Sequence, residues 1–265
     1  MMAHMDRGTR DIGSMPRGGP DASWLDRRLQ TNRLEYLDRD DVDDLKRAVV
    51  RSLDRVERWF GSHDKFARMA LDEVVNVPNP KILELGSGHG GLSRKLLENH
   101  PTAQVTVTDV DPTFVAAIAA SDLGSHPRAT VREMDATAID APDGDYDLVV
   151  FARSLHHLPP ALAARVFAEG TRAANTLLII DVRRLPTPRL LVKLAVRLPL
   201  LKLVPLLHDG FISSLRAYSP SALRALAHDA DSAITVEFRS RRRGPTVAVA
   251  SRARRAGNRL RDREP

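Results

Sequence analysis

Short apolar runs alternate with helical patterns between residues 81 and 181, and this alternation constrains the fold more than any other feature of the sequence. Strands that alternate with helices along a chain form a parallel sheet that helices cover on both faces. Ligands of such sheets bind beyond the carboxyl ends of the strands. The expected strands are 81–85, 104–108, 129–133, 146–151 and 176–180, and the expected helices between them are 92–99, 112–120 and 161–173.

The chain on either side of this alternation divides into further parts. The parts that we expect are a disordered arm or added residues over 1–23, an N-terminal helical cap over 24–76, the α/β domain over 77–250 and a basic tail over 251–265. The cap holds helical patterns over 24–37, 42–60 and 64–75. Near the end of the domain we expect a helix over 219–227, with Ser219 as N-cap and Pro220 at its first position, and a hairpin of strands 234–238 and 246–250.

Residues 184–210 interrupt the domain with a leucine-rich stretch that also carries Lys193, Arg197 and Lys202. These cations, together with two prolines, argue against a helix that spans a membrane. We expect a lid or wall over a hydrophobic acceptor. Burial against the N-terminal helices and peripheral contact with lipid headgroups are the alternatives.

The net charge of +6 comes mostly from the C-terminal part of the chain, because residues 239–263 hold ten arginines and one aspartate. No aromatic residue lies in 252–265 to stack on bases, so we expect a solvated tail and no nucleic-acid partner. The sequence has no cysteine, which excludes disulfides and thiolate chemistry. Its histidines lack metal-ligand spacing, so no metal is expected. The first residues show no secretion signal, which favours a cytoplasmic protein.

A glycine-rich loop follows the strand predicted over 81–85. Its glycines satisfy two patterns, G-x-G-x-x-G through Gly86, Gly88 and Gly91, and G-x-G-x-G through Gly86, Gly88 and Gly90. Glycine permits positive φ and lets a ligand approach the backbone, and the following helix offers free N–H groups to an anion. Both patterns therefore predict a nucleotide-like ligand, and they leave open a dinucleotide or an adenosyl amino acid.

Acidic residues at successive strand ends favour the adenosyl amino acid. Glu84 precedes the loop, where a carboxylate would repel a pyrophosphate and suit a cationic ligand directly or by anchoring the loop. Asp109 ends the second strand, where it could accept hydrogen bonds from both ribose hydroxyls. Asp135 follows the third strand, where it could accept from an adenine amino group.

The chain resembles the class I S-adenosylmethionine-dependent methyltransferases, of the small-molecule type related to quinone-biosynthesis methyltransferases. The stretches that carry the resemblance are "ILELGSGHGGLS", "VTVTDVDPTFV", "REMDAT" and "YDLVVFARSLHHLPP". It covers about residues 78–183, and 208–227 more loosely. The resemblance implies a Rossmann-like α/β fold with a mostly parallel seven-stranded sheet and S-adenosylmethionine as cofactor.

Residue by residue, the resemblance implies a cofactor site at the strand ends. The glycines would line the methionine part, Asp109 would hold the ribose, and Asp135 with the backbone of Ala136 would meet the adenine. The complete set that it implies is Glu84, Gly86, Ser87, Gly88, Gly90, Asp109, Val110, Asp135, Ala136, Phe151 and Ala152. Arg153 departs from the aliphatic residue that family members often carry at this place.

Methyl transfer from a sulfonium is an in-line displacement, so the protein mainly aligns the reactants. A phenol has a pKa near 10, so a nearby base speeds its methylation at neutral pH. The candidate bases are His157, His208 and His156. We therefore expect methylation, preferably at oxygen, of a small hydrophobic or phenolic acceptor in secondary or quinone-like metabolism. A nicotinamide-dependent oxidoreductase and a non-catalytic protein that binds S-adenosylmethionine are the alternatives.

Overall fold

The computed structural model describes residues 11–31, 62–184, 205–239 and 244–253, and for residues 205–209 it describes the backbone alone. The helix expected over 42–60 lies outside these residues. Most of the apolar stretch 184–210 and of the tail 251–265 lies outside them as well.

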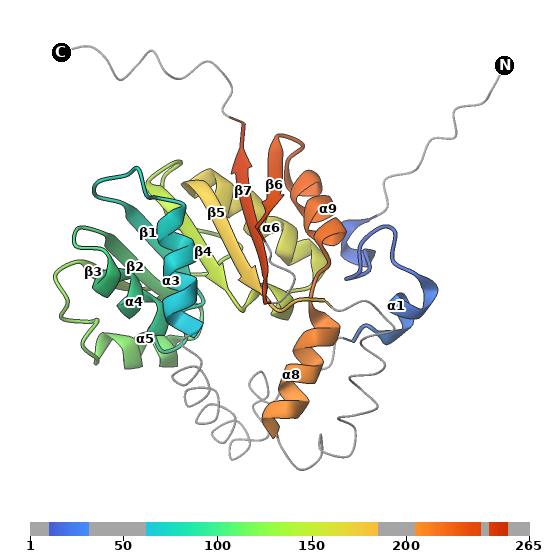
Figure 1. Cartoon of the computed structure of the whole chain (residues 1–265), viewed down its shortest axis with the longest axis horizontal. Coiled ribbons are helices and arrows are strands. Elements are labelled where there is room, and N and C mark those ends of the chain that lie inside the picture. Colours follow the sequence, from blue (N-terminus) through green and yellow to red (C-terminus); the bar gives the residue numbers. More distant parts are fainter. Residues whose placement is uncertain (1–10, 32–61, 185–204, 240–243, 254–265) are drawn as a thin grey trace.

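A single seven-stranded sheet organises the described residues, with strand order β3-β2-β1-β4-β5-β7-β6 (Figure 1). The first five strands are parallel to one another, and β7 is antiparallel to both β5 and β6. The strands are β1 Lys81–Leu85, β2 Gln104–Asp109, β3 Ala129–Glu133, β4 Tyr146–Ala152, β5 Ala174–Asp181, β6 Ile234–Phe238 and β7 Thr246–Arg252. This sheet confirms the predicted fold class, including the final hairpin.

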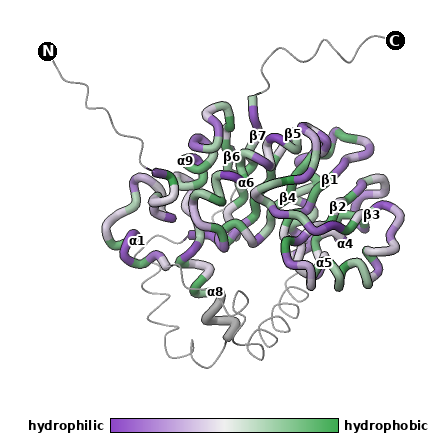
Figure 2. The backbone as a smooth tube through the Cα atoms, turned by 180° about the vertical axis from the view of Figure 1, so that it is seen from behind, coloured by the Kyte–Doolittle hydropathy of each residue, from purple (hydrophilic) through white to green (hydrophobic). Residues whose placement is uncertain are grey.

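Helices cover both faces of the sheet, as alternating strands and helices require. The helices are α1 Trp24–Leu29, α3 Ser62–Asp72, α4 Gly91–Asn99, α5 Pro112–Ala119, α6 Pro160–Ala173, α8 Pro205–Arg216 and α9 Pro220–Ala230, with short 3-10 turns η1 Ile12–Ser14 and η3 Leu155–His157. One core cluster joins α6 and α9 to the sheet, and a second joins α3, α4 and α5 to the opposite face. Figure 2 shows hydrophobic residues in the strands between these layers.

The helix α8 was not predicted from the sequence. Pro205 indicated an interruption, but the helix begins at this residue. Proline is tolerated in the first turn of a helix because the N–H that it lacks has no intrahelical partner there. The cap of α9 is as expected, with the Ser219 side chain accepting a hydrogen bond from the N–H of Ala222.

Residues 11–31 pack against the domain, which corrects the expectation of a disordered arm for 11–23. Figure 1 shows this segment beside α9, and Arg17 within it is buried. The composition of the segment is polar, which suggested disorder, but the Arg17 guanidinium donates to backbone carbonyls of the domain and Asp26 pairs with Arg184. Residues 1–10 lie outside the described part of the chain.

We expect the substitution Phe167→Ala to destabilise the domain by about 3–5 kcal/mol. Phe167 is fully buried in α6 within the first core cluster, so its removal loses apolar burial and leaves a cavity. Urea denaturation followed by circular dichroism measures the free energy of unfolding. Val75→Ala is the control, because the Val75 side chain is exposed and its truncation should change stability by less than about 0.5 kcal/mol. Equal losses in the two variants would contradict the assignment of this core.

Candidate functional site

The loop between β1 and α4 is built on glycines in a left-handed conformation. Gly86, Gly88 and Gly90 have φ of 59°, 55° and 73°. A side chain at Gly86 would lie 3.2 Å from Cε2 of Phe151, whereas one at Gly88 would meet no atom within 4 Å. The loop is therefore closely packed at its start and opens onto free space at Gly88.

Asp109, at the end of β2, holds this loop in place. Its Oδ2 accepts a hydrogen bond from the N–H of Gly88 at 2.9 Å, and its Oδ1 accepts one from the N–H of Asp111 at 3.0 Å. The N–H of Ser87 donates to the carbonyl of Thr108 at 2.9 Å. Each carboxylate oxygen can accept more than one hydrogen bond, so Asp109 retains acceptor capacity for a ligand. Its binding of a ribose stays a prediction.

Glu84 is buried beneath the loop and contacts α4. The hydroxyl of Ser93 donates a very short hydrogen bond to Oε2 of Glu84. Burial raises the pKa of Glu84 to about 7, although this hydrogen bond and the charge of His63 act to lower it. Of the two predicted roles, these contacts favour anchoring of the loop over a direct contact with a cation.

The end of β3 lies beside the end of β2, because the N–H of Met134 donates to the carbonyl of Asp109 at 3.0 Å. Asp135 follows it and is exposed, and its Oδ1 accepts hydrogen bonds from the N–H and hydroxyl of Thr137. Val110 is 62% exposed, which is unusual for a large apolar side chain at a strand end. These residues form an open rim on which the adenine contact remains a prediction.

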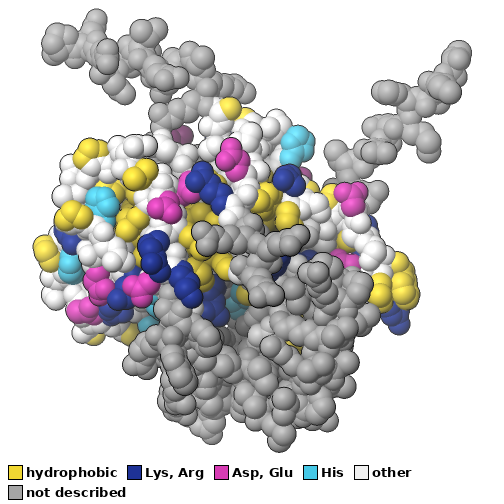
Figure 3. All heavy atoms as spheres, viewed as in Figure 1, with side chains coloured by type: hydrophobic (Ala, Val, Ile, Leu, Met, Phe, Trp, Pro, Cys, Tyr) yellow, Lys and Arg dark blue, Asp and Glu magenta, His cyan; other side chains and the backbone are white. Residues whose placement is uncertain are grey.

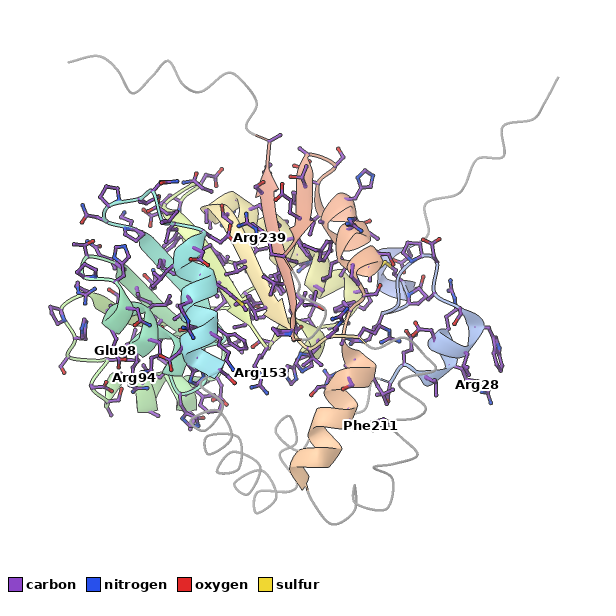
Figure 4. The ribbon with its side chains drawn as sticks, viewed as in Figure 1. Arg28, Arg94, Glu98, Arg153, Phe211 and Arg239 are labelled. Atoms are coloured by element: carbon purple, nitrogen blue, oxygen red, sulfur yellow. The ribbon has the colours of Figure 1, made fainter. Side chains whose placement is uncertain are left out.

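Arg153 follows β4 and is the only described residue other than glycine with positive φ, at 58°. A bulky residue in this region costs free energy and is held there by its surroundings. The N–H of Arg153 donates to the carbonyl of Ile180 at 2.7 Å. Figure 4 places Arg153 at the edge of the sheet between α3 and α8. The half-buried Ala152 and the buried Phe151 precede it, and Ala136 is half-buried on the rim.

His156 and Asp181 form a buried pair at the ends of β4 and β5. Nδ1 of His156 lies 2.6 Å from Oδ1 of Asp181, and the N–H of His156 donates to Oδ2 at 2.9 Å. Burial acts to raise the pKa of the Asp181 carboxyl, but the charge and hydrogen bond of His156 outweigh it and hold the pKa below its usual range. An ionised carboxylate in this position stabilises positive charge on an imidazole.

His157 is half-buried, and its ring centroid lies 4.2 Å from that of His156. The guanidinium of Arg216 donates to the carbonyl of His157 at 2.6 Å, and the hydroxyl of Tyr218 donates to the carbonyl of Leu158 at 2.8 Å. Burial raises the pKa of Tyr218 to about 12, so it remains a neutral donor. The side chain of His208, in α8, lies outside the described residues.

The partners of the predicted residues were not identified from the sequence. Asp181 is visible there as an acid after an apolar strand, the same signal that marked Asp109, but its pairing with His156 depends on the parallel register of β4 and β5. Ser93 gave no signal, because a serine in a helix is common. Within the described ranges, no cluster of metal-ligating side chains occurs and no helix is long and apolar enough to cross a membrane.

We expect Glu84→Gln to remove a pH dependence of stability. The folded-state pKa of about 7 lies above the ordinary value of 4.5, so this group contributes stability below pH 4.5 that is lost as pH rises through 7. The free energy of unfolding of the wild type, relative to E84Q, should therefore fall by about 3 kcal/mol between pH 4.5 and pH 8. Urea denaturation across this range measures it.

The matched control is Glu98→Gln, because Glu98 is an exposed glutamate on the same helix as Ser93 (Figure 4). A constant difference between wild type and E84Q at every pH would show that Glu84 titrates normally.

Comparison with known proteins agrees with this geometry. Residues 82–176 match a family model described as "Methyltransferase domain". The chain is 28% identical over 196 residues to a demethylmenaquinone methyltransferase of Thermus thermophilus. This match covers 68% of this chain and 86% of that protein. It is 33% identical over 105 residues to a trans-aconitate 2-methyltransferase of Streptomyces avermitilis, and the match covers 36% of this chain and 38% of that protein's length.

The fold is also shared with a solved methyltransferase. The structure of the plantazolicin methyltransferase BamL, in complex with a substrate analog and SAH, superposes with a TM-score of 0.57 over 77% of this chain and 89% of that one, at 10% identity. These matches favour a methyltransferase over a nicotinamide-dependent oxidoreductase or a non-catalytic binding protein. The family match over residues 82–176 and the similarity to these methyltransferases support a class I S-adenosylmethionine-dependent methyltransferase.

Proposed function

We propose that this enzyme methylates a small, hydrophobic or phenolic acceptor at oxygen, with a histidine after β4 as general base. The observation that carries the proposal is the buried pair of His156 and Asp181 beneath the half-buried ring of His157. The name of the Thermus thermophilus relative, demethylmenaquinone methyltransferase, supports a quinone-like acceptor. A cytoplasmic location stays a prediction.

The described residues fit S-adenosylmethionine, which supplies an activated methyl group when bound. The open space at Gly88 lies where a ligand can approach the backbone, and Asp109 holds the loop in that conformation. The exposed apolar side chain of Val110 offers a surface for the adenine next to the Asp109 carboxylate. Gly86 packs against Ser154 and Phe151, so the loop also reaches the end of β4, where the histidines lie.

The histidine pair suits proton removal from a phenol. His157 is the more accessible of the two rings, so it is our proposed contact with the acceptor hydroxyl. The ionised Asp181 lies behind His156 and stabilises the positive charge that the pair acquires when it takes the proton. The orientation of the His156 ring is fixed, because Asp181 holds both this ring and the backbone N–H of His156.

A carboxylate acceptor is the second candidate, and Arg153 favours it. Arg153 is half-buried and stands on strained backbone beside the ends of β4 and β5, where its positive charge would favour an acid. The name of the Streptomyces avermitilis relative, trans-aconitate 2-methyltransferase, supports such an acceptor. Basic and acidic side chains are interspersed on the face drawn in Figure 3, outside the residues drawn in grey.

We expect Gly88→Ala to weaken binding of S-adenosylhomocysteine at least tenfold, because the new methyl group enters the space that the ligand occupies. Isothermal titration calorimetry measures the Kd. Gly144→Ala is the matched control, since Gly144 also has positive φ, 69°, and open space around its Cα. Both variants should lose about 1 kcal/mol of stability, and G88A alone should lose affinity. Equal affinities in the two variants would contradict the placement of the ligand.

We expect His157→Asn to lower kcat with a phenolic acceptor by about 10²–10⁴-fold at pH 7. The deficit should shrink toward pH 10, because the phenol then ionises without a base. A panel of naphthols, hydroquinones and aromatic or aliphatic carboxylic acids, with product masses as readout, identifies the acceptor.

His228→Asn, an exposed histidine on α9, is the control and should retain full activity. Turnover of carboxylic acids alone would select the second candidate. Binding of S-adenosylmethionine without turnover of any panel member would overturn both.

A further inference from the structure

The strap, residues 11–31, is built into the domain at the start of α9. The carbonyl of Gly18 accepts hydrogen bonds from the hydroxyls of Ser219 and Ser221, at 2.6 and 3.1 Å. A side chain at Gly18 would collide with Asp26, and one at Gly19, where φ is 94°, would collide with Ser221. The two glycines therefore serve a close approach that larger residues would prevent.

Arg17, next to these glycines, is 4% exposed and reaches beneath the loop after β4. Its guanidinium donates to the carbonyls of His156 at 2.9 Å, Leu158 at 3.2 Å and Arg216 at 2.5 Å. It also lies 4.8 Å from the ring centroid of Tyr218. Arg17 thus holds the backbone of the loop that carries His156 and His157, the histidine loop, together with the end of α8.

The strap contacts the same helix end a second time. Asp26 pairs with the buried Arg184 at 3.0 Å, and Arg184 donates to the carbonyls of Leu215 and Ala217, each at 2.9 Å. With the Arg17 contact, three consecutive carbonyls at the C-terminal end of α8 receive hydrogen bonds from buried guanidinium groups. These carbonyls carry the negative end of the helix dipole and lack intrahelical partners, so cations are favoured there.

We infer that Arg17 is a positioning residue, through which the N-terminal strap sets the loop that carries His156 and His157 and aligns it with α8. The guanidinium of Arg17 acts through backbone carbonyl groups. It holds the His156 carbonyl on one side while Asp181 holds the His156 N–H and ring on the other. Asp109 and Glu84 hold the glycine loop by contacts of their own, so the contacts of Arg17 fall on the acceptor side of the site.

Arg17→Met tests this inference in the full chain, with Arg28→Met as the matched control. Arg28 points outward from α1 in the same strap (Figure 4) and contacts the exposed Trp24. Hydrogen exchange by mass spectrometry should rise at least tenfold over 154–158 and 210–219 in R17M, and should stay unchanged in β1 and α4. Arg17→Lys should restore part of the protection, since an ammonium can donate to fewer of the three carbonyls at once.

A spectroscopic readout separates positioning from a general loss of stability. The proton between Nδ1 of His156 and Asp181 should give a low-field NMR resonance, assigned by its absence in H156N. It should shift or vanish in R17M and persist in R28M. An unchanged resonance with unchanged exchange would overturn the inference. A uniform rise in exchange that includes β1 and α4 would overturn it too, because Arg17 would then only stabilise the whole domain.

The effect on turnover rests on the proposed function, whereas exchange and the resonance do not. With a phenol that the wild type methylates, R17M should lower kcat/KM at least tenfold while the Kd for S-adenosylhomocysteine stays within twofold. A tenfold higher Kd for S-adenosylhomocysteine in R17M would contradict the inference that Arg17 acts on the acceptor side of the site and not on the cofactor loop. Failure of the wild type on the whole panel would reject the proposed acceptor class, and the two other readouts would still decide the role of Arg17.

Discussion

A carboxylate at the end of one strand holds the loop that follows the neighbouring strand, and this arrangement occurs on both sides of the central pair β1 and β4. Asp109 of β2 accepts the N–H of Gly88 in the loop after β1. Asp181 of β5 accepts the N–H of His156 in the loop after β4. Parallel register makes both contacts possible, because it brings the carboxyl ends of adjacent strands to one edge. The glycine loop after β1 and the loop after β4 that carries the histidines are therefore fixed by the same kind of contact.

The two halves of this edge differ in which charged groups are buried and in what these groups contact. Beside the glycine loop, Glu84 is buried against the hydroxyl of Ser93, and burial raises its pKa. Beside the loop that carries the histidines, the buried Arg17 and Arg184 donate to carbonyl groups, and Arg184 also pairs with Asp26. Removing one member of a buried charged pair leaves the other without compensation, which costs more than the pair contributes. These groups therefore disfavour any arrangement of the strap, the loop and α8 that would separate them.

The sequence predicted the elements that follow from local pattern. The strands over 81–85, 129–133 and 234–238 have the predicted bounds, because apolar, β-branched runs between turn signals are local features. The strap was misjudged, since its order depends on carbonyls more than a hundred residues away. The pairing of Asp181 with His156 was missed for a similar reason, because it depends on the register of β4 and β5. Local sequence indicated which residues end the strands, and tertiary contacts decided which of them meet.

The position of β7 within the sheet bears on how the chain is made. This strand lies between β5 and β6, although it follows both in the sequence. Until residues 246–252 have left the ribosome, the apolar strand β5 presents one unpaired edge to other nascent chains. Strand β6 cannot cover that edge, because it pairs with β7 and not with β5. A message truncated shortly before this strand would yield a polypeptide that keeps every residue of the predicted cofactor site but exposes the unpaired edge of β5, which would favour its degradation by proteases.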